Sequence, residues 1–277
     1  MSPDRQRASL ALALLAAFLV SGCGSTPLIG GGSGAAAKPV VTEMPKLPEP
    51  KADPREAARL RVELAGLYLS RGSIGPALEE ATTASKLDPD NAQAFNMLGL
   101  ISMQIRDDPQ AVVNFERALR ISPSDPDVNN NYGWFMCERG RPLESIRLFQ
   151  VALRSPLYAS VDRTLANAGV CSRRGGDLAG ARRFFEQALA QQPAQPVALF
   201  HLADLDFADG NPMLARKQLE RLMQVAAPTA EVLWLGVRVE RALGDRKAEQ
   251  VYAQQLRRLF PEAPETAQLG GAVVPPR

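Results

Sequence analysis

Histidine and cysteine are the side chains that most often carry nucleophilic or metal chemistry, and this chain of 277 residues has one histidine and three cysteines. His201 alone cannot supply the two histidines of an HExxH zinc site, and no motif of a nucleophilic enzyme surrounds Cys137 or Cys171. The neighbouring carboxylates Glu79 and Glu80 fit the solvated face of a helix. We therefore expect no catalytic constellation, no metal site and no cofactor, and a His201 that is either solvated or satisfied by its surroundings.

The stretch GGGSG, residues 30–34, could suggest a phosphate-binding loop. It lacks the Lys-Ser/Thr pair that follows the glycines in a P-loop, and no strand pattern precedes it, so the sequence disfavours a phosphate-binding loop. The formal net charge of +2 provides no strong field to gather nucleic acid. We expect neither a nucleic acid partner nor a small-molecule substrate.

The first residues have the pattern of an export signal. Arg5 and Arg7 precede an apolar run from Leu10 to Val20, whose 11 residues are too few for a membrane-spanning helix, which needs about 20. A basic start, a short apolar core and small residues before a cleavage site predict a secretory signal peptide over residues 1–22. The sequence VSGC, residues 20–23, resembles the lipobox of bacterial lipoproteins.

The lipobox resemblance implies cleavage before Cys23, lipidation of its sulfur and acylation of the new amino group, and several acyl chains together anchor stably. Gly24, in place of aspartate, implies the periplasmic face of the outer membrane in a Gram-negative cell. Cleavage would leave 30 basic and 29 acidic residues and a net charge of +1. The alternative is an ordinary signal peptide cleaved elsewhere, with Cys23 present by chance.

Residues 23–56 form a predicted linker that begins at the lipidated cysteine. This segment is rich in glycine, proline and alanine and shows neither a helical nor an alternating apolar period. It buries too little apolar surface to offset the entropy lost on ordering. We expect a flexible tether whose ends lie on the order of 30 Å apart. Residues 263–277 are predicted to be a flexible tail.

Residues 57–262 repeat with a period of 34. Pairs of residues one period apart are Pro89 and Pro123, Ala65 and Gly99, Ala77 and Ala111, and Ala84 and Ala118. This spacing of small residues and a closing proline resembles the tetratricopeptide repeat family, in which helix-turn-helix units stack. The resemblance implies an all-α protein, a right-handed solenoid of about six repeats, with units at 58–91, 92–125, 126–159, 162–195, 196–228 and 229–262.

Packing explains the pattern within each unit. Small residues let the first and second helices approach closely, and Phe115, Phe149 and Phe185 fill the space that remains. Proline closes the second helix because it cannot continue a helix interior, and glycines between the two helices are expected to cap the first. Two extra residues in RSPLYAS, residues 154–160, separate units three and four, where we expect the stack to adjust.

The tetratricopeptide resemblance also implies which residues face the concave side, because the first helix of each unit lines it. The implied partner-binding groove is apolar, is edged with amides and has a tryptophan near its middle. Its members are Val62, Leu69, Asn96, Leu100, Met103, Asn130, Trp134 and Val170, with Cys137 as a further candidate. The alternative is that Trp134 packs internally against unit four, whereas Tyr132 and Gly133 are expected in the core.

Cys137 and Cys171 are separated by 34 residues, so the repeat places them on neighbouring first helices at similar heights. A disulfide needs α-carbons about 4.4–6.8 Å apart, which touching helices can provide, and the periplasm permits disulfides. Two buried free thiols are the alternative to a Cys137–Cys171 bridge.

A narrower resemblance lies in NNNYGWFMC (residues 129–137), GRPLESIRLFQVAL (140–153) and LWLGVRVERALGD (233–245). These runs are similar to the type IV pilus biogenesis and stability lipoproteins, the PilF/PilW group, which includes the pilotins of pilus secretins. The likeness covers residues 57 to 265.

The pilus resemblance implies a non-enzymatic outer-membrane lipoprotein that binds secretin subunits in its groove and aids their localisation and multimerisation, or that stabilises pili. One alternative is a repeat lipoprotein that scaffolds cell-wall or outer-membrane assembly partners. Another is an enzyme or protease subunit with a repeat appendage, for which the six units leave little room.

Overall fold

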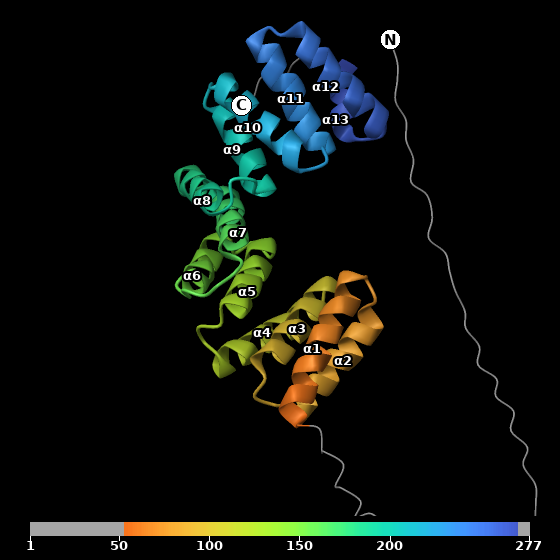
Figure 1. Cartoon of the computed structure of the whole chain (residues 1–277), viewed down its shortest axis with the longest axis vertical. Helices are drawn as coiled ribbons and strands as arrows, with labels where there is room; N and C mark the ends of the chain where they lie inside the picture. Colours follow the sequence, from red (N-terminus) through yellow and green to blue (C-terminus); the bar gives the residue numbers. More distant parts are fainter. Residues whose placement is uncertain (1–52, 271–277) are drawn as a thin grey trace, which may run out of the picture. The chain divides into compact units, whose positions relative to one another are not determined.

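Residues 53–270 are described by the computed structural model, and they form thirteen α-helices, one short 3-10 helix and no strand (Figure 1). The predicted signal peptide, Cys23 and nearly all of the predicted linker lie outside these residues. Within residues 53–270, no helix combines the length and the apolar character that a membrane span requires.

Twelve of the helices form six consecutive pairs, and each pair packs against the next. The pairs are α1 (Pro54–Ser70) with α2 (Ile74–Leu87), α3 (Ala92–Gln104) with α4 (Asp108–Ile121), α5 (Pro126–Glu138) with α6 (Pro142–Ala152), α7 (Val161–Arg174) with α8 (Leu178–Gln191), α9 (Pro196–Ala208) with α10 (Pro212–Val225), and α11 (Ala230–Leu243) with α12 (Arg246–Leu259). The expected all-α solenoid of tetratricopeptide helix pairs is confirmed.

Two boundaries differ from the sequence prediction. The first helix starts at Pro54, inside the predicted linker, because Pro54 suits the first turn and the Asp53 carboxylate accepts a hydrogen bond from the Arg55 amide at 3.0 Å. The predicted tail begins with the short helix α13 (Pro264–Ala267), which packs on α11 and α12. There the Thr266 hydroxyl donates to the Phe260 carbonyl at 2.6 Å.

The small residues of the repeat make room for one phenylalanine in each of three units. Phe115, Phe149 and Phe185 are fully buried. A methyl group added at Gly169 would come within 2.4 Å of the Phe185 ring, and one at Gly133 within 3.0 Å of Phe149. The two helices of a pair can therefore reach their observed separation only while the facing residue has no side chain.

Ion pairs join successive units toward the C-terminal end. Arg182 on α8 reaches the buried Asp206 on α9 at 2.6 Å and Asp209 at 2.8 Å. Arg216 on α10 binds the buried Glu240 on α11 with a contact of 2.9 Å. Hydrogen bonds to these carboxylates raise the pKa of both guanidinium groups, so each arginine remains charged and ties its unit to the next one.

The turn after the first helix of each unit needs one residue with positive φ. Five of the six units place glycine there, at Gly72, Gly140, Gly176, Gly210 and Gly244, with φ between 73° and 82°. Unit two places Arg106 at this position, with φ of 61°. A side chain in the left-handed region costs about 1–2 kcal/mol, so Arg106 is held against a local strain that its counterparts avoid.

We predict that Arg106→Gly stabilises the protein. Glycine relieves the backbone strain, but it also makes the unfolded chain more flexible, which offsets part of the gain. The net effect should raise the free energy of unfolding by roughly 0.5–1 kcal/mol and Tm by about 1–4 °C. Thermal unfolding followed by circular dichroism measures the change. Gly140→Arg, which makes the reverse change at the matching turn, should lower Tm, and a lower Tm for Arg106→Gly would contradict the strain.

Candidate partner-binding groove

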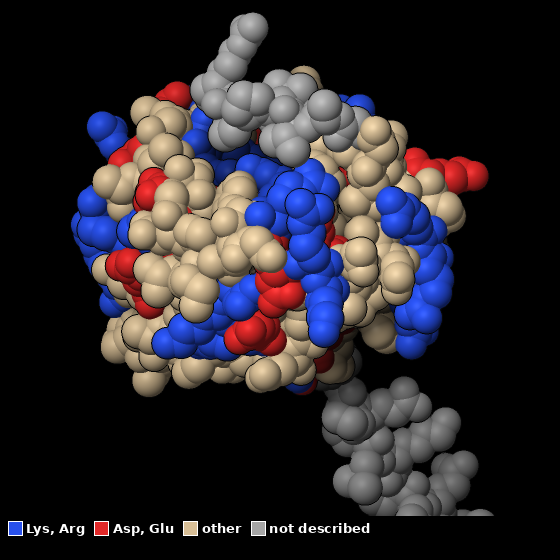
Figure 2. Space-filling view, turned by 90° about the horizontal axis from the view of Figure 1, so that it is seen from above, with Lys and Arg blue, Asp and Glu red and all other residues tan. Residues whose placement is uncertain are grey.

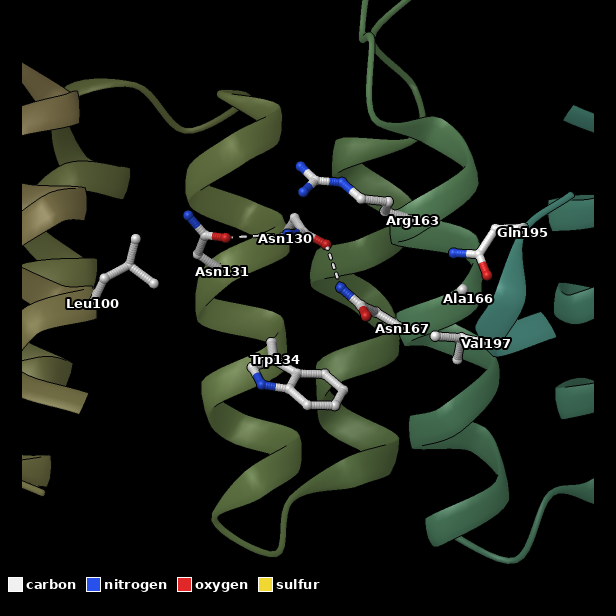
Figure 3. A pocket seen from close by; sticks show the side chains of 9 residues that line it. All are labelled: Leu100, Asn130, Asn131, Trp134, Arg163, Ala166, Asn167, Gln195 and Val197. Atoms are coloured by element: carbon white, nitrogen blue, oxygen red, sulfur yellow. Dashed lines mark hydrogen bonds between the residues drawn. The ribbon is translucent and has the colours of Figure 1, made fainter. Parts of the chain in front are cut away.

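Two hollows adjoin along the first helices α3, α5 and α7, because Leu100 and Trp134 line both of them. The amide hollow, of about 340 Å³, is lined by Leu100, Asn130, Asn131, Trp134, Arg163, Ala166, Asn167, Gln195 and Val197 (Figure 3). The Leu69 hollow, of about 380 Å³, is lined by Leu69, Leu100, Met103, Gln104, Arg106, Trp134, Glu138 and Arg139. Together they form one groove across units one to five.

A chain of amide hydrogen bonds runs across the amide hollow. The Asn131 amide group donates to Oδ1 of Asn96 at 3.2 Å, and that of Asn130 donates to Oδ1 of Asn131 at 3.1 Å. The Asn130 oxygen in turn accepts from Asn167 at 3.1 Å and from the Thr164 hydroxyl at 3.0 Å. These bonds link α3, α5 and α7, and they use only part of the donors and acceptors that four amides carry. The unused groups of Asn130, Asn131 and Asn167, which line the hollow, are available to a ligand.

Trp134 has two environments. Its half-buried ring lines both hollows and also packs on a core cluster that contains Cys137, Phe149 and Cys171. The Arg174 guanidinium lies 5.4 Å from the ring centroid and pairs with Glu138. The structure thus combines the two alternatives for Trp134, since one part of the ring packs against unit four while another part is presented to the groove.

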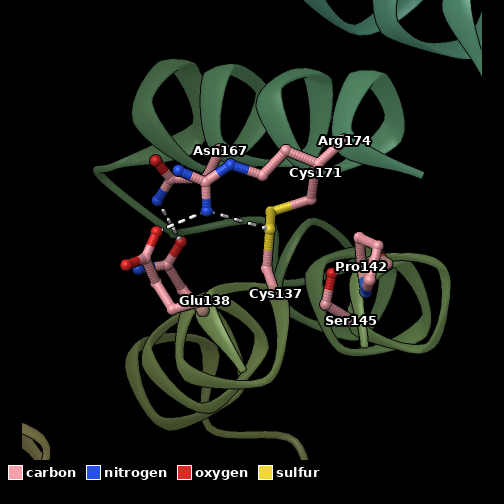
Figure 4. The surroundings of a disulfide bond; sticks show 8 residues. Cys137, Glu138, Pro142, Ser145, Asn167, Cys171 and Arg174 are labelled. Atoms are coloured by element: carbon pink, nitrogen blue, oxygen red, sulfur yellow. Dashed lines mark hydrogen bonds and ion pairs between the residues drawn. A yellow bond between two sulfur atoms is a disulfide. The ribbon is translucent and has the colours of Figure 1, made fainter. Parts of the chain in front are cut away.

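The core cluster on which Trp134 packs contains a disulfide. Cys137 on α5 and Cys171 on α7 have sulfurs 2.12 Å apart and α-carbons 5.8 Å apart (Figure 4). Cys137 is only 3% exposed, so it supports the groove and does not line it. Closing a loop of this length contributes about 4 kcal/mol in the chain-entropy treatment. The bridge fixes α5 against α7, the two helices that carry Asn130 and Asn167.

Five of the eight residues expected in the groove line the two hollows: Leu69, Leu100, Met103, Asn130 and Trp134. Three lie elsewhere. Asn96 is 4% exposed and holds Asn131 in place, whereas Val170 packs against the core around Phe185. Val62 lines a separate hollow between α1 and the start of α3. The expectation that Asn96 lines the groove is therefore corrected, whereas the half-buried Val170 lines neither hollow.

Sequence reasoning missed Asn131, Asn167, Arg163, Gln195 and Arg106 as lining residues. Asn131 and Asn167 occupy equivalent positions in their helices, and Asn131 directly follows the predicted groove residue Asn130. This equivalence is the signal in the sequence that points to both residues. Gln195 precedes α9, and its side-chain oxygen accepts a hydrogen bond from the Ala198 amide at 3.1 Å. Its NH₂ group remains at the edge of the amide hollow (Figure 3).

His201, on α9, is satisfied by neighbouring side chains. Its Nδ1 lies 2.9 Å from Nη1 of Arg173, and its ring stacks on Phe185 with centroids 5.0 Å apart. Burial, followed by the positive charge of Arg173, lowers the pKa of His201 to about 4. Arginine can only donate, so Nδ1 accepts and the proton of the neutral ring lies on Nε2. Among the described residues, no group of three or more His, Cys, Asp or Glu side chains could hold a metal ion.

Charged side chains of both signs share the surface. On the face seen from the top of the view in Figure 1, lysines and arginines lie beside aspartates and glutamates (Figure 2). Ion pairs between charges of opposite sign also occur in the groove, as between Arg139 and Asp108 at 2.7 Å. Such a distribution is unlike the basic stripe that follows a phosphate backbone.

Comparisons with known proteins agree with the repeat architecture. The model of the family described as tetratricopeptide repeat matches residues 173–233. The type IV pilus assembly protein PilF of Pseudomonas aeruginosa is 29% identical over 206 residues, which cover 74% of this chain and 82% of PilF.

Two solved structures are similar over most of their length. The crystal structure of PilW, described as a widely conserved type IV pilus biogenesis factor, has a TM-score of 0.69 and 31% identity and covers 76% of this chain and 97% of PilW. The structure of P. aeruginosa PilF has a TM-score of 0.73 and 28% identity and covers 78% of this chain and 97% of that protein.

We predict that Cys137 and Cys171 are oxidised in protein prepared from the periplasm. Replacing both with alanine should lower the free energy of unfolding by about 4 kcal/mol, measured by urea denaturation, because the unfolded chain regains the freedom that the bridge removes. The reduced wild-type protein serves as the control and should match the double variant. Mass spectrometry that finds alkylated Cys137 and Cys171 without prior reduction would contradict the bridge.

We predict that His201 remains neutral well below its ordinary pKa of 6.5. Because the folded-state pKa is lowered, the neutral ring contributes stability that is fully present above pH 6.5 and is lost as the pH falls toward 4. Nuclear magnetic resonance titration measures this directly, since the chain has a single histidine. His201→Gln should lack this loss of stability, and a titration midpoint near 6.5 would contradict the buried, hydrogen-bonded state.

Proposed function

Because the chain belongs to the PilF and PilW family of tetratricopeptide repeat proteins, we propose that it acts in type IV pilus biogenesis by binding secretin subunits and aiding their multimerisation at the outer membrane. In this proposal it is a non-enzymatic lipoprotein anchored through Cys23. The observation that carries the proposal is the groove, in which an exposed edge of Trp134 and the side chains of Leu100 and Met103 adjoin a chain of amides.

The groove chemistry supports a protein client. Tryptophan is enriched among residues that dominate binding energy, and burial of one large apolar client side chain against Trp134 and Leu100 would contribute about 1.5–3 kcal/mol. The amides of Asn130, Asn167 and Gln195 supply donors and acceptors of the kind that a polypeptide main chain requires. A segment of a secretin subunit in extended or helical form is therefore a suitable occupant.

The anchor and the linker complete the proposal, and Cys23 and nearly all of the predicted linker lie outside the described residues. Lipidated Cys23 would hold the protein at the outer membrane, and the predicted linker would let the solenoid reach clients on the order of 30 Å away. Secretin subunits that bind the groove would then be brought together at the membrane in which they assemble. A scaffold for cell-wall or outer-membrane assembly partners would use the same anchor with another client, so the secretin itself must be measured.

We predict that detergent-resistant secretin multimers disappear from the outer-membrane fraction of a strain that lacks this protein and return when the wild-type gene is restored. Trp134→Ala should restore few multimers, because it removes the central apolar contact. Leu157→Ala, at a side chain that is 93% exposed and lies outside both hollows, should restore them fully. Unchanged multimers in the deletion strain would reject the secretin role, and full rescue by a folded Trp134→Ala protein would reject this groove as its site.

A further inference from the structure

Arg106 is a strained residue at the edge of the groove. Among residues 53–270 it alone has a side chain other than glycine's hydrogen at positive φ, and it lines the Leu69 hollow. The five matching turns use glycine, which adopts this conformation without cost. Its side chain is exposed and so has no core to fill. Strain of this kind often marks a functional position, and the groove is the feature that Arg106 adjoins.

Arg163 has a corresponding place at the amide hollow. Its side chain extends from α7 toward Asn130 on α5 (Figure 3), and its guanidinium donates to the Ser160 hydroxyl at 2.9 Å. The positive charge of Arg163 acts on Asp127 from a distance. Within the described part of the chain, neither Arg163 nor Arg106 forms an ion pair of 4.0 Å or less.

The other charges of the groove are already paired. Glu138 binds Arg174, and Arg139 binds Asp108 at 2.7 Å. The pKa of Asp108 is lowered mainly by its hydrogen bond from Arg139, and the more distant charge of Arg106 adds to this effect. Each hollow therefore presents one guanidinium that has no ion-pair partner among the described residues, and the two hollows share the apolar surface of Leu100 and Trp134.

From this arrangement we infer that the groove selects a polypeptide segment in which carboxylates flank a large apolar side chain, an inference that rests on the proposed protein-binding function. The apolar side chain of the peptide lies on Trp134 and Leu100. Its carboxylates pair with Arg106 and Arg163, whose planar guanidinium groups can form bidentate hydrogen bonds. The amides hold the intervening main chain. Arg106 keeps its strained backbone because glycine at this turn would remove one of the two cations.

A library of short random peptides displayed on phage tests the inference without assuming which protein is the client. Panning against the wild-type protein should enrich sequences with Asp or Glu near Phe, Leu or Trp. Panning against the double variant Arg106→Gly/Arg163→Gln should retain the apolar preference and lose the acidic one. Arg183→Gln, at an exposed arginine on α8 outside both hollows, is the matched control and should select acidic sequences as the wild type does.

A peptide enriched by the wild-type protein then gives the magnitude. Its affinity should fall about fivefold for each single variant, the upper range for an exposed ion pair, and the loss should shrink at high salt. Arg106→Gly should weaken binding while its Tm stays equal to or above that of the wild type, which separates a binding role from a folding defect. A peptide whose acidic residues are replaced by Asn or Gln should bind weakly, and it should bind the wild-type protein and each single variant with equal affinity.

Three outcomes would overturn the inference: no peptide enriched by the wild-type protein, enriched peptides without acidic residues, or acidic preference unchanged in the double variant. These outcomes are independent of the secretin measurement. Loss of secretin multimers on Trp134→Ala, together with unaltered rescue by Arg106→Gly/Arg163→Gln, would sustain the proposed function and reject the charge selection. If the groove selects acidic peptides but secretin multimers do not depend on this protein, the charge selection is sustained and the secretin role is rejected.

Discussion

The contact between a glycine on the first helix of a unit and a phenylalanine on the second is the constraint on which the central units depend. Gly169 faces Phe185 at a distance that leaves no room for a methyl group, and at Gly133 a methyl group would be in tight contact with Phe149. This contact sets how closely the two helices pack, and therefore how the next unit meets them. The same separation in consecutive units brings α5 and α7 side by side.

The alignment of α5 and α7 gives the groove its polar character. Residues 34 to 37 positions apart in the sequence face each other across the two helices, so Asn130 reaches Thr164 and Asn167, and Cys137 meets Cys171. The disulfide below and the amide chain above connect the same pair of helices at different heights. A groove built in this way presents amides whose positions are fixed before any ligand arrives, which lowers the entropy lost on binding.

Around this rigid centre the structure combines three kinds of chemistry at one surface. Trp134 and Leu100 supply apolar area, the amides supply neutral donors and acceptors, and Arg106 and Arg163 supply positive charge. The central position of Trp134 depends on Arg174, which covers one face of the ring, and on the cysteine cluster beneath it. Stability and recognition thus share residues here, while the strain at Arg106 shows one place where the two are opposed.

The sequence alone determined the repeat, because a period of 34 residues is a local property of the chain and each helix pair must bury the same positions. It located the phenylalanine cores and the glycine turns, and it offered Cys137–Cys171 as one of two alternatives. Tertiary structure decided what depends on the distance and rotation between units. It buried Asn96 and packed the half-buried Val170 against the cluster around Phe185, whereas Asn131, one residue from a predicted position, became exposed to the groove. It also revealed that Arg106 occupies a left-handed turn. A repeat pattern specifies which residues are equivalent, but the exposure and hydrogen bonding of each one depend on side chains contributed by the neighbouring units.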